Sequence, residues 1–153
     1  MSTPGVDVVA DIVAAMGTRT ATFIDSKFQT LKFVREIEKN PSNLNFGYGF
    51  LVGSASPSEV QILQNYCLAI NISLVLFASA VKKQGEEEIQ TELLDLHAWA
   101  DRAAKDYALT RLGLSTVLKI GQHSINEPVY HKDMTAVSLE VVFPIHFRQP
   151  LHT

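Results

Sequence analysis

The residues of this chain that could perform chemistry are few and widely spaced. Four potential metal ligands, His123, His131, Asp133 and His146, fall in or near a polar segment towards the C-terminus. A metal site needs three or four donors that converge on one point. No tight spacing pre-positions these four side chains, so we predict neither a metal site nor a metal cofactor.

A second chemical candidate is the glycine-rich stretch Gly47-Tyr48-Gly49, followed by Gly53. A phosphate-binding loop needs a Lys-Ser/Thr ending and must open a helix, and this stretch has neither feature. The nucleophile-elbow pattern Gly-x-Ser-x-Gly is also absent from the sequence. The single cysteine, Cys67, excludes an internal disulfide and falls in a predicted strand, where a thiol usually fills space. We therefore predict no catalytic residue and no bound cofactor.

The composition is typical of a globular protein and disfavours several classes of function. The chain has 153 residues, of which 46% are apolar and 19% charged, and its net charge is −3. That length is most simply one domain, here residues 1–153. General nucleic-acid binding needs a concentrated basic surface, which the negative charge disfavours. The apolar run at residues 70–80 is too short to span a bilayer, and no segment resembles a signal peptide. We expect no membrane partner and a chain assembled in cytoplasm.

Two long alternating segments would form the frame for any site. Between residues 66 and 78 every even residue is apolar, and between residues 137 and 147 every odd residue is apolar. This period of two predicts antiparallel strands with one buried face and one wetter face. A third strand, residues 44–52, has aromatic residues on one side and glycines on the other. Shorter strands are predicted at residues 31–37 and 117–120.

The strongest helical pattern, residues 86–112, lies between the two alternating segments. Its apolar residues recur at steps of three and four, and Gly113 follows its end. A shorter helix is predicted over residues 6–16, ended by Gly17. The remaining segments are less regular: residues 18–29 suit a helix or a strand, 53–58 predict a flexible link, and 121–135 predict a polar loop or ragged hairpin. This order predicts a single α+β domain, with a mainly antiparallel sheet flanked by a short N-terminal helix and one long helix.

Loops carried on a rigid sheet often make protein contacts when they have a function. An aromatic strand with glycines behind it also suits lateral packing of subunits. These patterns indicate an assembly protein with candidate subunit or partner contacts at Phe46, Tyr48, Phe50, Ser54, Ser56, His123, Asn126, Tyr130, His131 and Arg148.

In its order of elements the chain resembles the tail terminator, or tail-completion, proteins of long-tailed bacteriophages. The matching stretches are residues 6–16, 66–78 and 86–112, and the closing Val-Ser-Leu-Glu-Val-Val-Phe-Pro-Ile-His-Phe-Arg at 137–148. The resemblance covers nearly the whole chain and includes no invariant motif. It implies a non-enzymatic structural protein of the virion, placed at the neck of the tail and assembled in the host cytoplasm. Such proteins form a closed ring, usually of six subunits, that caps the head-proximal end of the tail tube, stops its polymerisation and joins the tail to the head.

The resemblance also implies partners, which are other copies of the chain, the tail tube protein and the head connector or neck proteins. DNA would only pass through the lumen of the ring. Residues 86–112 hold seven acidic and three basic side chains, so an acidic helix face with Glu87, Glu88 and Glu92 could line that lumen. Two other interpretations stay open. One is another neck or head–tail connector ring protein, and the other is a small cytoplasmic α+β enzyme or ligand-binding domain, which would need an apolar pocket with convergent polar groups.

Overall fold

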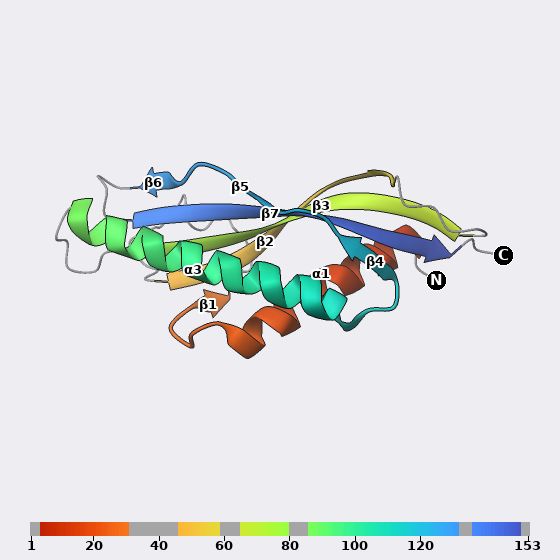
Figure 1. Ribbon diagram of the computed structural model, residues 1–153, viewed down its shortest axis with the longest axis horizontal. Coiled ribbons are helices and arrows are strands. Elements are labelled where there is room, and N and C mark those ends of the chain that lie inside the picture. Colours follow the sequence, from red (N-terminus) through yellow and green to blue (C-terminus); the bar gives the residue numbers. More distant parts are fainter. Residues whose placement is uncertain (1–3, 31–45, 59–64, 80–85, 132–135, 151–153) are drawn as a thin grey trace.

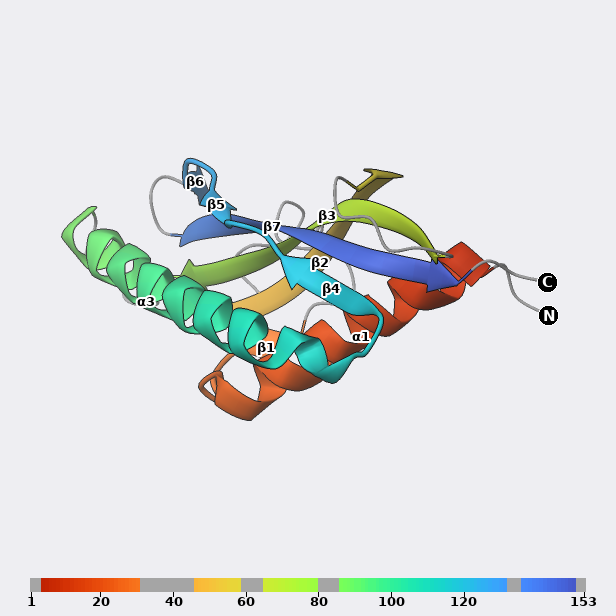
Figure 2. The same cartoon turned by 45° about the vertical axis from the view of Figure 1, so that its right-hand side comes forward.

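Both helices of the computed structural model lie against one face of a twisted, seven-stranded sheet (Figures 1 and 2). The structure describes residues 4–30, 46–58, 65–79, 86–131 and 136–150. In chain order the elements are helix α1 (Pro4–Phe23), strands β1 (Gln29–Thr30), β2 (Phe46–Pro57) and β3 (Asn65–Ser79), helix α3 (Glu86–Thr110), the 3₁₀ turn η2 (Arg111–Gly113), and strands β4 (Val117–Ile120), β5 (Ser124–Ile125), β6 (Val129–His131) and β7 (Ala136–Pro150). The predicted α+β domain with a mainly antiparallel sheet and two helices is confirmed.

The sheet is built around β3 and β7, which pair antiparallel along their whole length, from Asn65 opposite Pro150 to Ser79 opposite Ala136. β2 pairs antiparallel with the other side of β3, while β4, β5 and β6 pair antiparallel with the far side of β7. Among the described strands, only β1 runs parallel to its neighbour, β2. The sheet therefore has two unlike edges, one made by β1 and β2 and one made by β4, β5 and β6.

The core lies between the sheet and the two helices, where the alternating residues were predicted to be buried. The even residues of β3 from Ile70 to Ala78 and the odd residues of β7 from Val137 to Phe147 are all buried. They pack against Ile12 and Met16 of α1 and against the apolar stripe of α3, which consists of Ile89, Leu93, Leu96, Ala100, Ala103 and Tyr107. More of the opposite face is buried than alternation predicts, because Ser73, Val75 and Phe77 of β3 are buried as well.

Two sequence predictions about element boundaries are wrong. Gly17 does not end the first helix, because α1 continues to Phe23; a Cβ at position 17 would stand 3.9 Å from the ring of Phe50, an ordinary contact distance. Residues 53–58 are not a flexible link, because β2 runs on to Pro57 and pairs with β3 there. The predicted strand at residues 31–37 lies outside the described residues. The predicted end of the long helix is confirmed, since α3 closes through η2 and Gly113 has a φ of +69°.

A buried hydroxyl pair joins α1 to α3. The Thr20 hydroxyl donates to the carbonyl of Met16 at 2.6 Å, which leaves its oxygen to accept from the Tyr107 hydroxyl, 2.5 Å away. Thr20 and Tyr107 are fully buried, and burial raises the pKa of the Tyr107 hydroxyl far above its ordinary value. Beside them, Arg19 donates two hydrogen bonds to the Asp106 carboxylate, at 3.0 and 2.6 Å. These contacts hold the C-terminal halves of the two helices together.

Replacing Thr20 by valine is expected to lower the free energy of unfolding by about 1–3 kcal/mol, because the Tyr107 hydroxyl would lose its acceptor inside the core. Urea denaturation measures the effect. Thr18→Val is the matched control, since Thr18 bonds the carbonyl of Ala14 in the same way but is exposed. Adding Tyr107→Phe should recover part of the loss. A double variant as unstable as the sum of its two single variants would contradict this account.

Candidate interaction surfaces

Three of the aromatic residues predicted for a subunit interface, those of β2, pack against other residues of the same subunit. Tyr48 is only 4% exposed, and its hydroxyl accepts a hydrogen bond from Thr30 Oγ1 at 3.1 Å. The Phe46 ring packs edge-on against the Phe28 ring, with centroids 5.5 Å apart, and the half-buried Phe50 ring contacts the Tyr48 ring edge-on at 6.2 Å. Their main contacts are therefore with the core and with the N-terminal segment.

The outer half of β2 is exposed instead, and we call residues 51–57 the β2 edge. Every residue of this segment is exposed, including Leu51 at 43% and Val52 at 51%. Beyond Tyr48, no strand of the described residues pairs with the outer side of β2. Soluble proteins usually protect such an edge with charges, yet the β2 edge has none. The predicted contacts Ser54 and Ser56 lie on this edge.

A local irregularity keeps the β2 edge attached to the sheet. The register between β2 and β3 shifts between Val52 and Ala55, which indicates a bulge. Gly53 occupies this bulge, and a Cβ there would stand 2.9 Å from the carbonyl oxygen of Asn71. No larger residue fits without moving the backbone, so the glycine lets the strand stay paired with β3 up to Pro57 despite the bulge.

An apolar groove runs beside the β2 edge on the helix side of the sheet. It has a volume of about 670 Å³. Its lining residues are all apolar or glycine, and they come from α1 and from the two strands next to it: Val9, Ala10, Val13, Ala14, Val52, Gly53 and Ile70. We call this feature the α1 groove. Because Val52 and Gly53 belong to both features, the groove and the β2 edge form one continuous apolar surface.

The second exposed apolar surface lies at the opposite edge of the sheet, on β5 and β6. We call residues 124–131 the β5–β6 arm. It exposes Ile125 at 38%, Val129 at 54% and Tyr130 at 37%. Asn126 anchors the arm twice to Glu140, because its backbone N–H donates to the Glu140 carbonyl and its side-chain amide donates to the carboxylate, both at 3.0 Å. The Tyr130 hydroxyl also accepts a hydrogen bond from Gln90 Nε2 of α3 at 3.3 Å, so the arm is held in place while its apolar side chains remain partly exposed.

The other predicted residues are scattered over the molecule. His123 is half-buried beside the ring of Phe143, 5.9 Å between centroids. Arg148 is half-buried in β7, and its backbone N–H donates to the carbonyl of Thr116. His131 is the last residue of β6, and the structure describes its backbone but not its side chain. Of the acidic residues, Glu87 and Glu88 lie in the first turn of α3, and the structure does not describe their side chains. Glu92 is half-buried.

Two arrangements bear on the enzyme interpretation. Ser58 Oγ lies 2.6 Å from His146 Nδ1, a contact between a nucleophile type and a base type. Ser58 is only 7% exposed, and its N–H also donates to the carbonyl of Cys67, so the contacts tie the end of β2 to β3 and β7. A cleft of about 280 Å³ lies between α3 and β4, but its charged residues Asp101 and Lys105 pair with each other at 3.0 Å. Within the described ranges, no group of three or more His, Cys, Asp or Glu could hold a metal ion.

The sequence prediction included Tyr130 but missed the α1 groove and the other exposed apolar residues of the two edges, Leu51, Val52, Ile125 and Val129. One signal was present in the sequence, since no charged residue occurs between Lys39 and Glu59. The absence of charge is typical of a strand that is buried on both faces, and it is unusual for an exposed sheet edge. The exposed apolar residues Ile125 and Val129 gave no such signal, because they are separated by polar residues that are typical of a loop.

No protein-family model matches the chain, and no curated protein is significantly similar to it in sequence. In the part of the chain that the structure describes, neither helix is long and apolar enough to cross a bilayer. The function must therefore be inferred from the chain's own residues and surfaces.

Proposed function

We propose that the chain is a structural ring protein of the tail-terminator class, which caps the head-proximal end of a phage tail tube and joins the tail to the head. The observation that carries this proposal is the pair of unlike apolar edges on opposite sides of one sheet, the β2 edge and the β5–β6 arm. The order of elements along the chain, which resembles that of the tail terminators, supplies the particular kind of ring.

Two unlike edges favour a ring over a symmetric dimer. A contact between one edge of a copy and the other edge of the next copy is heterologous, so each added copy presents the same free edge again. Such a contact grows into an open filament unless the rotation between copies closes it into a ring. Closure would use every edge and fix the number of copies in the ring.

The position of the helices decides what such a ring would present to DNA. α1 and α3 lie on the same face of the sheet (Figure 2). The thicker helical layer takes up more circumference, so we place it outside and the opposite sheet face towards the lumen. That face includes the exposed Asn71 and the half-buried Glu140 and His146. A lumen lined by Glu87, Glu88 and Glu92 requires the reverse orientation.

Deleting the gene from the phage or prophage that encodes it tests the proposal. A missing terminator leaves the growth of the tail tube unchecked, so electron microscopy should show overlong tubes and heads without attached tails. The intact gene supplied in trans should restore normal particles. Unattached tails of normal length would instead identify a head–tail connector, and infectious particles of normal form would overturn the proposal altogether.

A further inference from the structure

We propose that the β5–β6 arm of one copy pairs with the β2 edge of the next copy and places apolar side chains in its α1 groove. This inference rests on the proposed ring and specifies the contact between its subunits. In the described part of the chain, β5 and β6 pair with β7 alone, and the β2 edge pairs with β3 alone. Among the described residues, each edge therefore has one side of its backbone without a strand partner, as strand addition to a sheet edge requires.

The side chains of the arm divide between the two faces of the sheet. Ile125 is opposite Val141, and Tyr130 is opposite Val137. Both partners belong to the buried, helix-covered face of β7, so Ile125 and Tyr130 lie on that face. Val129 is opposite Ser138 and lies on the other face.

The side chains of the β2 edge divide in the same way. Val52 is opposite Ile72, a residue of the helix-covered core, and Val52 also lines the α1 groove. Leu51 is opposite Ser73 and lies on the other face. Each edge thus exposes apolar side chains on both faces.

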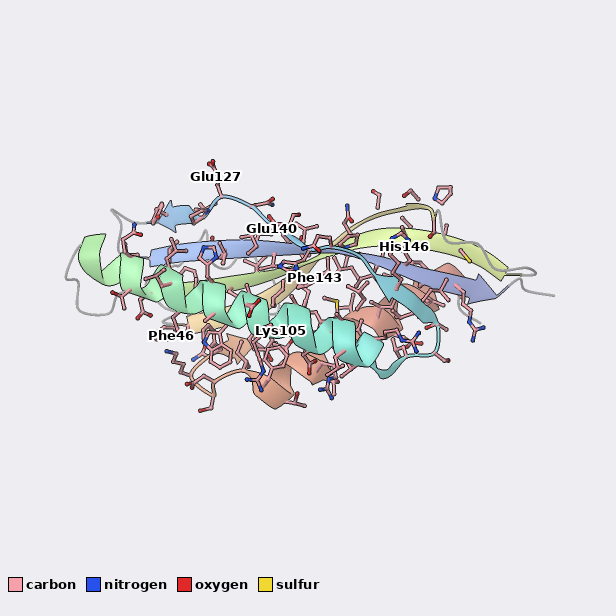
Figure 3. The ribbon with its side chains drawn as sticks, viewed as in Figure 1. Phe46, Lys105, Glu127, Glu140, Phe143 and His146 are labelled. Carbon is pink, nitrogen blue, oxygen red and sulfur yellow. The ribbon has the colours of Figure 1, made fainter. Side chains whose placement is uncertain are left out.

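If the two edges join into one continuous sheet, the helix-covered face of one copy continues into the helix-covered face of the next, and so do the opposite faces. A strand that extends a sheet keeps its side chains on alternating faces, so Ile125 and Tyr130 of one copy meet Val52 and the α1 groove of the next. On the opposite face, Val129 meets Leu51. Glu127 of the arm points away from the sheet (Figure 3).

The groove supplies contact area that strand pairing alone would lack. A stable interface takes about 800 Å² from each partner, and the surface of one copy is 8848 Å². The strands β5 and β6 have two and three residues, which allow only a short row of backbone hydrogen bonds. Filling the α1 groove adds apolar burial next to that row, at about 25 cal/mol per Å².

Cross-linking between single-cysteine variants tests this contact. All variants carry Cys67→Ala, which removes the native cysteine. Val52→Cys is mixed with Ile125→Cys for the helix side, and Leu51→Cys with Val129→Cys for the other side. The mismatched mixtures, Val52→Cys with Val129→Cys and Leu51→Cys with Ile125→Cys, are the controls. A short bis-maleimide tolerates a small shift along the strands but disfavours a change of face. All four positions are exposed, so the substitutions should not prevent folding.

We expect at least about tenfold more cross-linked dimer in the two matched mixtures than in the mismatched ones, and none from any variant alone. A chain carrying both Val52→Cys and Ile125→Cys should give a ladder of bands that ends at the ring size. Cross-linking of Val52→Cys with itself would show a symmetric edge-to-edge dimer and overturn the inference. An oligomer detected by light scattering without any matched cross-link would also overturn the inference about this contact. The proposed ring itself would not be contradicted by that result. A monomer without cross-links at millimolar concentration overturns the inference too, and the gene deletion then decides the function independently.

Discussion

Glutamate at both Leu51 and Val52 is expected to convert the assembled protein into a monomer. The two side chains lie on opposite faces of the uncharged β2 edge, and both are exposed in the single copy. In the proposed ring they become buried, and an unpaired carboxylate in such a contact costs about 3 kcal/mol or more. Each charge should then weaken the contact by more than about 100-fold. Light scattering after size exclusion should show the mass fall from that of the ring, about 100 kDa for six copies of the 16.9 kDa chain, to one copy.

The matched control introduces the same charges where no contact is proposed. Leu94 and Leu109 are apolar residues on α3, 71% and 87% exposed. Leu94→Glu with Leu109→Glu should leave the mass unchanged. Circular dichroism should show that both double variants remain folded. A variant with glutamates at 51 and 52 that stays fully assembled would show that the β2 edge is not the interface.

Alternation predicts the centre of the fold well, because the even residues 70–78 of β3 and the odd residues 137–147 of β7 are all buried beneath the helices. It fails where a residue's partner is distant in the sequence. Gly17 signals a helix end, but α1 continues past it, because Thr20 three residues further on is fully buried against Tyr107 of α3, which offsets the cost of about 1 kcal/mol for a glycine within a helix. Phe77 lies on the face predicted to be wetter and is nevertheless 0% exposed. Neither contact can be recognised from the local pattern.

The candidate surface was predicted only in part, for a related reason. Residues 53–57, Gly-Ser-Ala-Ser-Pro, have the composition of a loop, but strand pairing depends on backbone hydrogen bonds, and β3 offers a long partner. The aromatic residues before them suggested an interface. Their register places Phe46, Tyr48 and Phe50 opposite Ala78, Leu76 and Leu74, on the core face. The interface that we propose therefore lies further along the same strand, at Leu51, Val52 and the serines, rather than at the aromatic residues.

Replacing Phe143 by alanine should have the largest effect on the stability of the single copy. Phe143 lies on β7 between the sheet and α3 (Figure 3) and is 1% exposed. Its ring packs edge-on against the Tyr107 ring, with centroids 5.0 Å apart. A large aromatic residue removed from a core leaves a cavity and costs about 3–5 kcal/mol. That is a large share of the roughly 5–15 kcal/mol that stabilises a typical domain.

Urea denaturation should therefore show Phe143→Ala with a much lower midpoint than the parent protein, or already partly unfolded in buffer. Phe143→Leu is the control, since it keeps most of the volume and should lose clearly less. The ring contact itself is worth about 0.5–1.5 kcal/mol beyond burial, which a double-mutant cycle of Phe143→Leu with Tyr107→Leu measures as a coupling energy. If Phe143→Ala lowers the free energy of unfolding by less than about 1 kcal/mol, the packing of α3 against the sheet does not depend on the aromatic ring of Phe143. In that case the frame that holds the β5–β6 arm on β7 would depend on the β3–β7 pairing rather than on the packing of α3.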